Sequence, residues 1–289
     1  MKRIKVCLVG RQPVPNLLPV RYYKPHQVIL ICSKTTKPVS ERLEKVLEKD
    51  MKVATLQIDN PYDIVSITKN LKEQLLNITH QAEIIFNVTG GTKIMSYAAI
   101  QVAQEFKSKV IYLESEKNQS KLYQYRFENS ELLLLETKMI KEALTIDEYL
   151  KIYIGSYGPR KRGQNLFEQT VLEVLRPHVP EIMSNVSFGT NIELDLVIRF
   201  GNQLGVAEVT VGKPNKAKID QLNSATRQEF LGTYTKRFLI TAQEQQDQNN
   251  RISAEAYNIS VIELLSYSNG ELSSEDREKL VEKIKDKFS

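Results

Sequence analysis

The chain has 289 residues, of which 41% are hydrophobic and 26% charged, a composition typical of a globular protein with about two domains. No run approaches the roughly 18 apolar residues of a membrane span, and the apolar stretch after the N-terminus is too short for a secretion signal, so we expect a cytoplasmic protein that does not enter a membrane. Three scattered histidines, and two cysteines inside apolar runs, argue against a zinc site and a disulfide framework.

The net charge of +5 lies in the first half of the chain. Residues 1–150 carry 22 Lys and Arg against 17 Asp and Glu, whereas residues 151–289 carry 18 of each. This small excess slightly favours an anionic ligand for the first half, although a solvated surface explains it as well.

Short apolar strands alternate with amphipathic helices in the first half. The predicted strands are 3–9, 27–32, 52–58, 83–88 and 109–114, and the predicted helices are 40–49, 62–76 and 92–107. This alternation predicts a parallel, doubly wound, Rossmann-like sheet. Two further strands, 121–126 and 131–136, form a predicted hairpin at the end of a domain that we place at 1–144.

The second half has a different order of elements. A predicted helix (145–154) and the linker GSYGPRKRG (155–163) supply a connecting segment at 145–162, followed by a second α/β domain at 163–289. Its predicted elements, in chain order, are a helix at 164–176, strands at 182–188, 192–199 and 204–211, a helix at 215–230, a strand at 236–241, a helical region, a strand at 258–262 and a helix at 273–287. The polar stretch 242–250 is expected to be a mobile surface segment.

The loop NVTGGTK (87–93) follows a predicted strand and opens a predicted helix. Its two glycines allow a close backbone approach, and the free N–H groups at the start of the helix favour a phosphate. In a parallel sheet, ligands bind outside the carboxyl ends of the strands, where this loop lies. A tight turn without a ligand remains the alternative, because the loop matches neither a Walker A nor a GxGxxG pattern.

Two more polar loops are expected at the same edge of the sheet. GRQPVPNLLP (10–19) follows the first strand and SKTTK (33–37) follows the second. Together with NVTGGTK they could enclose an extended polyanion, or they could be ordinary surface turns.

The segments RQPVPNLLP, SKTTK and NVTGGTKIMSYAA make the first half resemble the CRISPR-associated Rossmann-fold (CARF) sensor domains, specifically those fused to nucleases in type III CRISPR ancillary effectors. The resemblance implies a homodimer that binds a cyclic oligoadenylate across its two-fold axis. We favour the tetra-adenylate, although the sequence does not fix the ring size. Carried over to this chain, the implied ligand-binding residues are Gln12, Pro13, Asn16, Ser33, Thr35, Thr89, Gly90, Gly91, Thr92 and Lys93.

Three spaced acids stand out in the second half. Glu168 lies on a predicted helix, and Asp195 and Glu208 lie on neighbouring predicted strands, each within an apolar frame. If the strands pair, the two strand acids can converge on one Mg²⁺ or Mn²⁺ ion, which prefers oxygen ligands. Each acid taken alone is more often a solvent-facing residue.

This arrangement resembles the PD-(D/E)xK nuclease superfamily, a restriction-endonuclease-like fold. Glu168 matches the helix glutamate, and Asp195 and Glu208 match the strand acids that hold the metal. The sequence departs from the motif at Thr210, where a lysine is expected; Lys213 or Lys218 could supply that cation, or either could contact phosphate or solvent.

Two functions remain open at this point. The resemblance implies a metal-dependent nuclease, acting on DNA or RNA, that the cyclic oligoadenylate activates. The alternative is a ligand-controlled nucleic-acid-binding protein, or a sensor that sequesters or degrades its ligand, with a degenerate nuclease domain. The basic run PRKR (159–162) could contact a nucleic-acid backbone, but such runs are more often just solvated.

Overall fold

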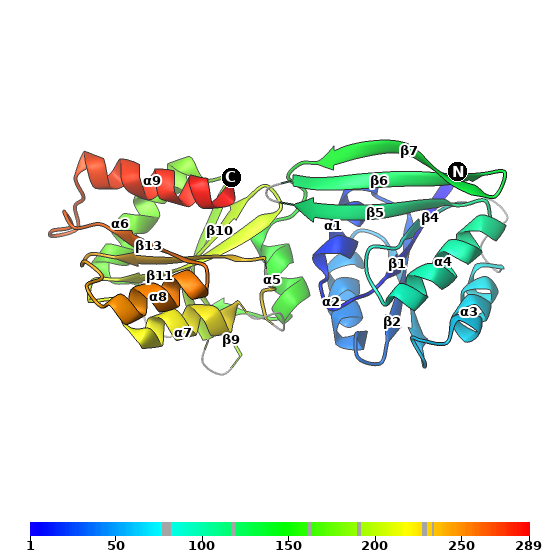
Figure 1. The fold of residues 1–289 in the computed structure, drawn as a ribbon, viewed down its shortest axis with the longest axis horizontal. Coiled ribbons are helices and arrows are strands. Elements are labelled where there is room, and N and C mark those ends of the chain that lie inside the picture. Colours follow the sequence, from blue (N-terminus) through cyan, green and yellow to red (C-terminus); the bar gives the residue numbers. More distant parts are fainter. Residues whose placement is uncertain (77–81, 117–118, 161–162, 190–191, 227–229, 233) are drawn as a thin grey trace. The chain divides into compact units, whose positions relative to one another are not determined.

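The computed structural model describes residues 1–76, 82–116, 119–160, 163–189, 192–226, 230–232 and 234–289. The chain divides into two compact units, Met1–Leu144 and Thr145–Ser289. Each unit holds a sheet with helices packed on it, so the predicted α/β class is confirmed (Figure 1). Among the described residues, none of the helices is long and apolar enough to cross a membrane.

The sheet of the first unit has, in the described residues, the strand order β3-β2-β1-β4-β5-β6-β7. Strands β1 to β5 are parallel, and the antiparallel hairpin of β6 and β7 continues the sheet beyond β5. The strands are β1 (Lys2–Leu8), β2 (Gln27–Ser33), β3 (Lys52–Ile58), β4 (Ala82–Asn87), β5 (Lys109–Glu116), β6 (Gln119–Glu128) and β7 (Glu131–Ile140). The strand order reverses between β1 and β4, which makes their carboxyl ends the switch point where such sheets bind ligands.

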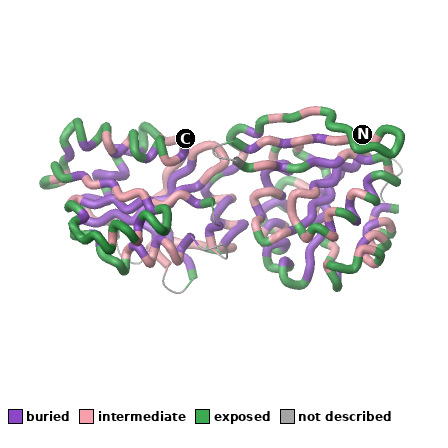
Figure 2. The backbone as a smooth tube through the Cα atoms, in the orientation of Figure 1, coloured by how far each residue is buried: buried purple, intermediate pink, exposed green. Residues whose placement is uncertain are grey.

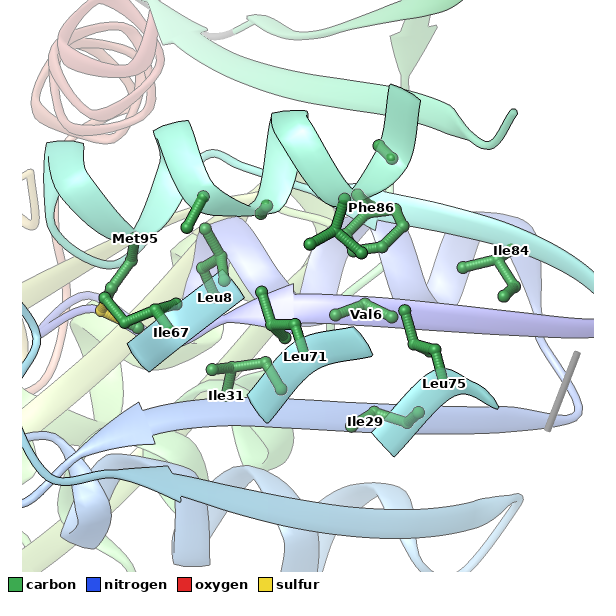
Figure 3. Packing of buried hydrophobic residues seen from close by; sticks show 14 of the residues in the cluster. Val6, Leu8, Ile29, Ile31, Ile67, Leu71, Leu75, Ile84, Phe86 and Met95 are labelled. Atoms are coloured by element: carbon green, nitrogen blue, oxygen red, sulfur yellow. The ribbon is translucent and has the colours of Figure 1, made fainter. Parts of the chain in front are cut away.

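Four helices are described in the first unit: α1 (Val14–Tyr23), α2 (Lys37–Leu47), α3 (Ile64–Leu76) and α4 (Lys93–Glu105). Helix α3 buries Ile67, Leu71 and Leu75, which share one face because they are spaced four residues apart. These side chains pack with Val6, Leu8, Ile29, Ile31 and Phe86 of the strands and Met95 of α4 (Figure 3). This core fixes the strand ends that carry the predicted ligand loops.

Helix α1 replaces most of the polar loop that we expected at 10–19, so that expectation is wrong. Pro15 stands in the first turn, where a missing N–H is tolerated, and Leu17 and Leu18 are fully buried. Pro19 lies inside the helix and cannot donate to the carbonyl of Pro15. Asn87 donates to that oxygen instead, at 2.8 Å from its Nδ2. The helix therefore depends on a residue of the neighbouring β4 strand.

The sheet of the second unit has the order β13-β12-β11-β10-β9-β8 in the part of the chain that is described. Pairing is antiparallel from β8 to β11 and parallel from β11 to β13. The strands are β8 (Gly158–Pro159), β9 (Glu181–Phe188), β10 (Ile192–Phe200), β11 (Gln203–Thr210), β12 (Lys236–Thr241) and β13 (Ile259–Glu263). Buried residues follow the central strands of both units (Figure 2).

The helices of the second unit are α5 (Ile146–Ile154), α6 (Leu166–Leu175), the 3-10 turn η2 (Arg176–His178), α7 (Lys216–Ala225), α8 (Gln248–Ala256) and α9 (Ser274–Phe288). Helices α6 and α9 share a core with the sheet, including Phe167, Leu196, Phe238 and Phe288. Helix α5 is tied to the same sheet, because Glu181 of β9 accepts a hydrogen bond of 3.0 Å from the N–H of Ile146.

Three expectations for the second half need correction or restriction. Gly158–Pro159 pairs with β9, so the linker at 155–163 is not wholly irregular. The polar stretch 242–250 is not simply a surface segment, since Gln245 is buried and donates to the carbonyl of Pro214 at 3.2 Å. Helix α7 ends at Ala225, and residues 227–229 of the predicted helix, like 161–162 of PRKR, lie outside the described residues.

Candidate functional site

The loop after β4 is built around the side chain of Asn87. Its Oδ1 accepts hydrogen bonds from the N–H of Thr89 at 3.2 Å and from the Thr89 hydroxyl at 2.7 Å. The same hydroxyl oxygen accepts from the N–H of Leu113 on β5, at 2.8 Å. Thr89 therefore shapes the loop and joins it to β5.

Gly90 and Gly91 are required by the close backbone approach and the backbone conformation of this loop. A Cβ on Gly90 would stand 2.2 Å from the carbonyl oxygen of Leu8, and Gly91 has a φ of +76°. A Cβ on Gly10, in the loop after β1, would lie 3.1 Å from the N of Gly91. The loops after β1 and β4 thus touch through their backbones at the switch point.

Helix α4 begins directly behind this loop. Thr92 is its N-cap: Oγ1 accepts from the N–H of Met95 at 3.1 Å, and the hydroxyl donates to the carbonyl of Pro61 at 2.8 Å. The hydroxyl protons of Thr89 and Thr92 are both directed to protein acceptors, so neither points outward in this structure. Lys93 is the first residue of α4 and is exposed, which leaves its charge available to an anion.

The residues predicted after β1 lie beside this loop. Asn16 is buried; its Nδ2 donates to Leu8 at 3.0 Å and its Oδ1 accepts from Asn87 at 3.3 Å. Pro13 is buried and precedes α1, and Gln12 is half-buried next to it. In this structure Asn16 ties α1 to the two central strands, while Gln12 lies closer to the surface.

The residues predicted after β2 form a compact hydroxyl group. The Oγ of Ser33, at the buried end of the strand, lies 2.9 Å from the Oγ1 of Thr35. Thr35 is exposed. Because β2 is parallel to β1, these hydroxyls stand at the same edge as the loops after β1 and β4.

Basic side chains that we did not predict as ligand residues stand in these loops. Arg11, Lys34 and Lys37 are all exposed, as is Lys93. They could have been found from the sequence, because they stand next to the residues that the CARF resemblance implies as ligand-binding. Four exposed cations in three adjoining loops create a positive edge suited to an extended anion.

The acids of the second unit come together around the β10–β11 pair. Leu196 is paired with Ala207, so Asp195 and Glu208 are the next residues on the two strands. Oδ2 of Asp195 accepts from the N–H of Val209 at 2.6 Å. Glu168 joins them from the first turn of α6, which Asn165 caps by accepting from the N–H of Glu168 at 2.9 Å. All three acids are buried, with at most 7% of the residue exposed.

Two cations are paired with these acids. Arg160 forms ion pairs with both Glu168 and Asp195, and Lys218 of α7 forms one with Glu208. Of the two lysines predicted as replacements for the motif lysine, Lys218 is therefore at the acids, whereas Lys213 is exposed and has no contact with them among the described residues.

Two further residues complete the surroundings of Glu208. Thr210, which stands in the motif-lysine position, is buried, and its hydroxyl accepts from the N–H of Gly212 at 3.3 Å. Gln221, one turn after Lys218 on α7, donates to the carbonyl of Glu193 at 2.9 Å and lies 3.5 Å from a Glu208 oxygen.

Sequence reasoning missed Arg160 and Gln221 as partners of the acids, because both contacts depend on tertiary structure. Asn165 could have been found from the sequence, since an Asn three residues before Glu168 is an N-cap pattern.

The electrostatics of the site show a surplus of negative charge. Burial, followed by the charge of Glu208, raises the pKa of Asp195 to about 7, and the Val209 N–H and Arg160 only partly oppose this. Burial lowers the pKa of Arg160, but its hydrogen bond to Glu168 and the charge of Asp195 outweigh that effect and raise it. Three buried carboxylates thus face two cations in this part of the described structure.

This donor set fits a hard divalent cation. Asp195 and Glu208 present carboxylate oxygens on adjacent strands, which Mg²⁺ and Mn²⁺ prefer, and the three acids together have one cation fewer than they have carboxylates. As the side chains stand, no group of three His, Cys, Asp or Glu side chains among the described residues is arranged to hold a metal. Arg160 is paired with both Asp195 and Glu168, so it occupies carboxylate oxygens that a metal would need.

Comparison with known proteins identifies the first unit. Residues 4–149 match the family described as the Card1 CARF domain. The chain belongs to this family. The resemblance noted in the loops after β1, β2 and β4 is thereby confirmed. No curated protein matches the sequence.

Solved structures extend the similarity to both units of this CARF protein. Can2 from Sulfobacillus thermosulfidooxidans, in complex with cyclic tetra-adenylate, has a TM-score of 0.75 at 19% identity, with 99% of each chain covered. Protein VC1899 from Vibrio cholerae has a TM-score of 0.73 at 13% identity, covering 99% of this chain and 97% of its own.

A type III CRISPR defence DNA nuclease activated by cyclic oligoadenylate has a TM-score of 0.57 at 14% identity, covering 84% of this chain but 45% of that protein. At these identities the likeness concerns the fold. It confirms a Rossmann-like CARF unit followed by a second α/β unit of the kind found in these proteins.

Proposed function

We propose that the first unit binds a cyclic oligoadenylate, with the tetra-adenylate as the leading candidate. Membership of the CARF family and the similarity to Can2, which was solved with cyclic tetra-adenylate, support this ligand. The exposed Arg11, Lys34, Lys37 and Lys93 around the switch point supply the positive charge that its phosphates need. We further propose a homodimer, because a symmetric cyclic ligand suits two identical patches related by a two-fold axis.

We propose that the second unit is a metal-dependent nuclease that this ligand switches on. The observation that carries the proposal is the convergence of Glu168, Asp195 and Glu208 with Lys218 on one buried site. Asp195 and Glu208 would hold Mg²⁺ or Mn²⁺, which when bound supplies an activated water and stabilises charge on the phosphate.

Lys218 reaches the site from helix α7. The strand position where the motif has its lysine is Thr210 in this chain. Its ammonium is paired with Glu208 and 27% of its side chain is exposed. It can therefore orient Glu208 and also face the phosphate of a nucleic acid, where a fixed cation lowers the barrier to cleavage.

Cleavage in the presence and absence of the ligand tests the proposal. The full chain is incubated with Mn²⁺ and plasmid DNA, single-stranded DNA or single-stranded RNA, with and without cyclic tetra-adenylate. We expect at least one substrate to be cut only when the ligand is present, and Glu208→Ala to abolish that cutting. Intact substrate in every reaction, or undiminished cutting by the variant, would exclude the nuclease.

A non-catalytic binding module is the second candidate, and Thr210 is the observation that favours it. The strand position that carries lysine in the PD-(D/E)xK motif has no charge here. Under this alternative, cyclic tetra-adenylate would tighten the binding of labelled nucleic acid without any cleavage.

A further inference from the structure

Arg160 is held on the sheet of the second unit by a very short edge strand. Strand β8 has two residues: Gly158 is paired with Ser187, and Pro159 with Val186. The N–H of Arg160 then donates to the carbonyl of Asn185 at 3.0 Å. This attachment fixes the backbone from which the arginine side chain enters the acid site.

The guanidinium engages carboxylate oxygens that the proposed divalent cation would use. It donates to Oδ1 of Asp195 and Oε2 of Glu168, and to the carbonyl of Gly163 at 3.3 Å, with 5% of the side chain exposed. Oδ2 of Asp195 already accepts from the N–H of Val209. Both oxygens of Asp195 are therefore engaged by protein donors while Arg160 is in place.

We propose that Arg160 is an autoinhibitory latch, by which we mean that residues 158–160 must leave the acids before Mg²⁺ or Mn²⁺ binds. This inference rests on the proposed metal site. An arginine cannot release its proton at accessible pH, so the conflict with a second cation is not relieved by titration. The guanidinium repels an ion that approaches the same carboxylate, and only its movement frees the oxygens.

The local structure permits such movement. Strand β8 is held to β9 by its backbone pairing and by the Ser187 hydroxyl, which donates to the carbonyls of Gly158 at 3.3 Å and Pro159 at 3.0 Å. Because β8 is at the edge of the sheet, its separation leaves the pairing of the other strands intact. Gly155 (φ +83°) and Gly163 flank the segment. The chain leaves the first unit at Leu144, sixteen residues before Arg160, and helix α5 fills most of that interval. A change in the first unit can thus reach the latch along a short, partly rigid connection.

Binding of Mn²⁺ to the full chain, without nucleic acid or cyclic nucleotide, tests the latch directly. Free Mn²⁺ is followed by electron paramagnetic resonance. We expect Arg160→Ala to bind at least about tenfold more tightly than the wild type, since a tenfold change is a modest fraction of the repulsion removed. Arg176→Ala, which removes an exposed charge from η2, should bind like the wild type. Binding by Arg160→Ala that is no tighter than wild type would overturn the latch.

A reversible crosslink covers the case in which Arg160→Ala does not fold. Gly158 and Ser187 are cross-strand partners, and a hydrogen-bonded antiparallel pair places its Cα atoms about 5.5 Å apart, as a disulfide needs. A Cβ at position 158 meets no atom within 4 Å. In Gly158→Cys/Ser187→Cys, oxidation should weaken Mn²⁺ binding at least about tenfold in the presence of cyclic tetra-adenylate, and reduction should restore it. Equal binding in both redox states would contradict the latch.

The two proposals fail in different ways. Ligand-dependent cutting by the wild type, together with unchanged Mn²⁺ binding by Arg160→Ala, would remove the latch and keep the nuclease. Tighter Mn²⁺ binding by Arg160→Ala, with no cutting under any condition, would support the latch and remove the nuclease.

Discussion

The carboxylate of Asp195 couples the acid site to the stability of the second unit. Burial and the charge of Glu208 raise its pKa to about 7 in the folded protein, from an ordinary value of 3.8. The folded state therefore keeps a proton that the unfolded chain releases between about pH 4 and 7. Over that range the free energy of unfolding falls as pH rises, by up to about 1.4 kcal/mol per pH unit, and above it the effect is constant.

Asp195→Asn removes this titration, so the unfolding free energies of the variant and the wild type should depend differently on pH. In EDTA, the variant should gain stability relative to the wild type as pH rises from 4 to 7, with no further gain above pH 7. Urea unfolding at a series of pH values measures the difference. Asp286→Asn, the same change on the exposed surface of α9, controls for the lost charge. A constant difference between Asp195→Asn and wild type across this range would contradict the assignment.

Gly90 is the residue on which the switch-point geometry depends most directly. A Cβ there would stand 2.2 Å from a backbone oxygen of Leu8, which cannot move aside as a side chain could. We expect Gly90→Ala to destabilise the first unit by about 1–3 kcal/mol and to weaken binding of cyclic tetra-adenylate, measured by chemical unfolding and calorimetry. Gly163→Ala is the matched control, because a Cβ at that position meets no atom within 4 Å. Equal stability of both variants would show that the loop after β4 can move away from the end of β1.

Among the elements, helix α7 determines which lysine serves the acid site. Lys218 is paired with Glu208, whereas Lys213 precedes the helix and is exposed. If the second unit is a nuclease, Lys218→Ala should reduce the ligand-dependent cleavage rate by about 10²–10³-fold, as for other lost charge-stabilising groups. Lys213→Ala should stay within a few-fold of wild type. The reverse order of effects would assign the cation to the strand exit instead.

Helix α1 depends on strand β4 through the side chain of Asn87, which donates to the carbonyl of Pro15 and to Oδ1 of Asn16. Pro19 leaves the carbonyl of Pro15 without its helical donor, and Asn87 fills that role. Asn87→Ala should cost about 1–3 kcal/mol of unfolding free energy, because a buried acceptor loses its partner.

Restoring the helical donor offers the decisive control for Asn87. Pro19→Ala supplies an N–H at position 19, so in the Asn87→Ala background it should recover part of the loss. The double-mutant cycle should show a coupling of about 1 kcal/mol. Strict additivity of the two substitutions would mean that the Pro15 carbonyl is satisfied in another way.

Helices α1 and α7 and the strands around them show what could and could not be predicted from the sequence. The parallel strands and the helices behind NVTGGTK were predicted because apolar periodicity is local. Helix α1 was missed because prolines 15 and 19 look like loop residues, and the donor that compensates Pro19 lies 68 residues further along the chain. The three acids were named from their spacing, and Lys218 was named with Lys213 from the PD-(D/E)xK resemblance. Arg160 was assigned to a linker, since its contacts with Glu168 and Asp195 depend on the pairing of β8 with β9.

For the whole molecule, the two units place opposite charges at their candidate sites. The edge of the first sheet carries exposed cations, and the acid site of the second unit holds more carboxylates than cations. A polyanion and a divalent metal ion are the ligands that complement these two sites. If the cyclic oligoadenylate and the metal bind as proposed, and one of them changes the affinity of the protein for the other, the effect must be reciprocal and of the same factor.

This reciprocity yields a prediction for the proposed dimer. Calorimetry should give one cyclic tetra-adenylate per two chains, and light scattering should give the mass of two chains, because a two-fold symmetric ligand is shared by two identical loops. Mn²⁺ at saturating concentration should tighten the binding of cyclic tetra-adenylate by about 5–150-fold, the usual range of such coupling. Asp195→Asn, which loses a proposed metal ligand but no residue of the first unit, should keep the stoichiometry and lose the effect of Mn²⁺. One ligand per chain would exclude the shared site, and an affinity independent of Mn²⁺ in the wild type would show that the two units act separately.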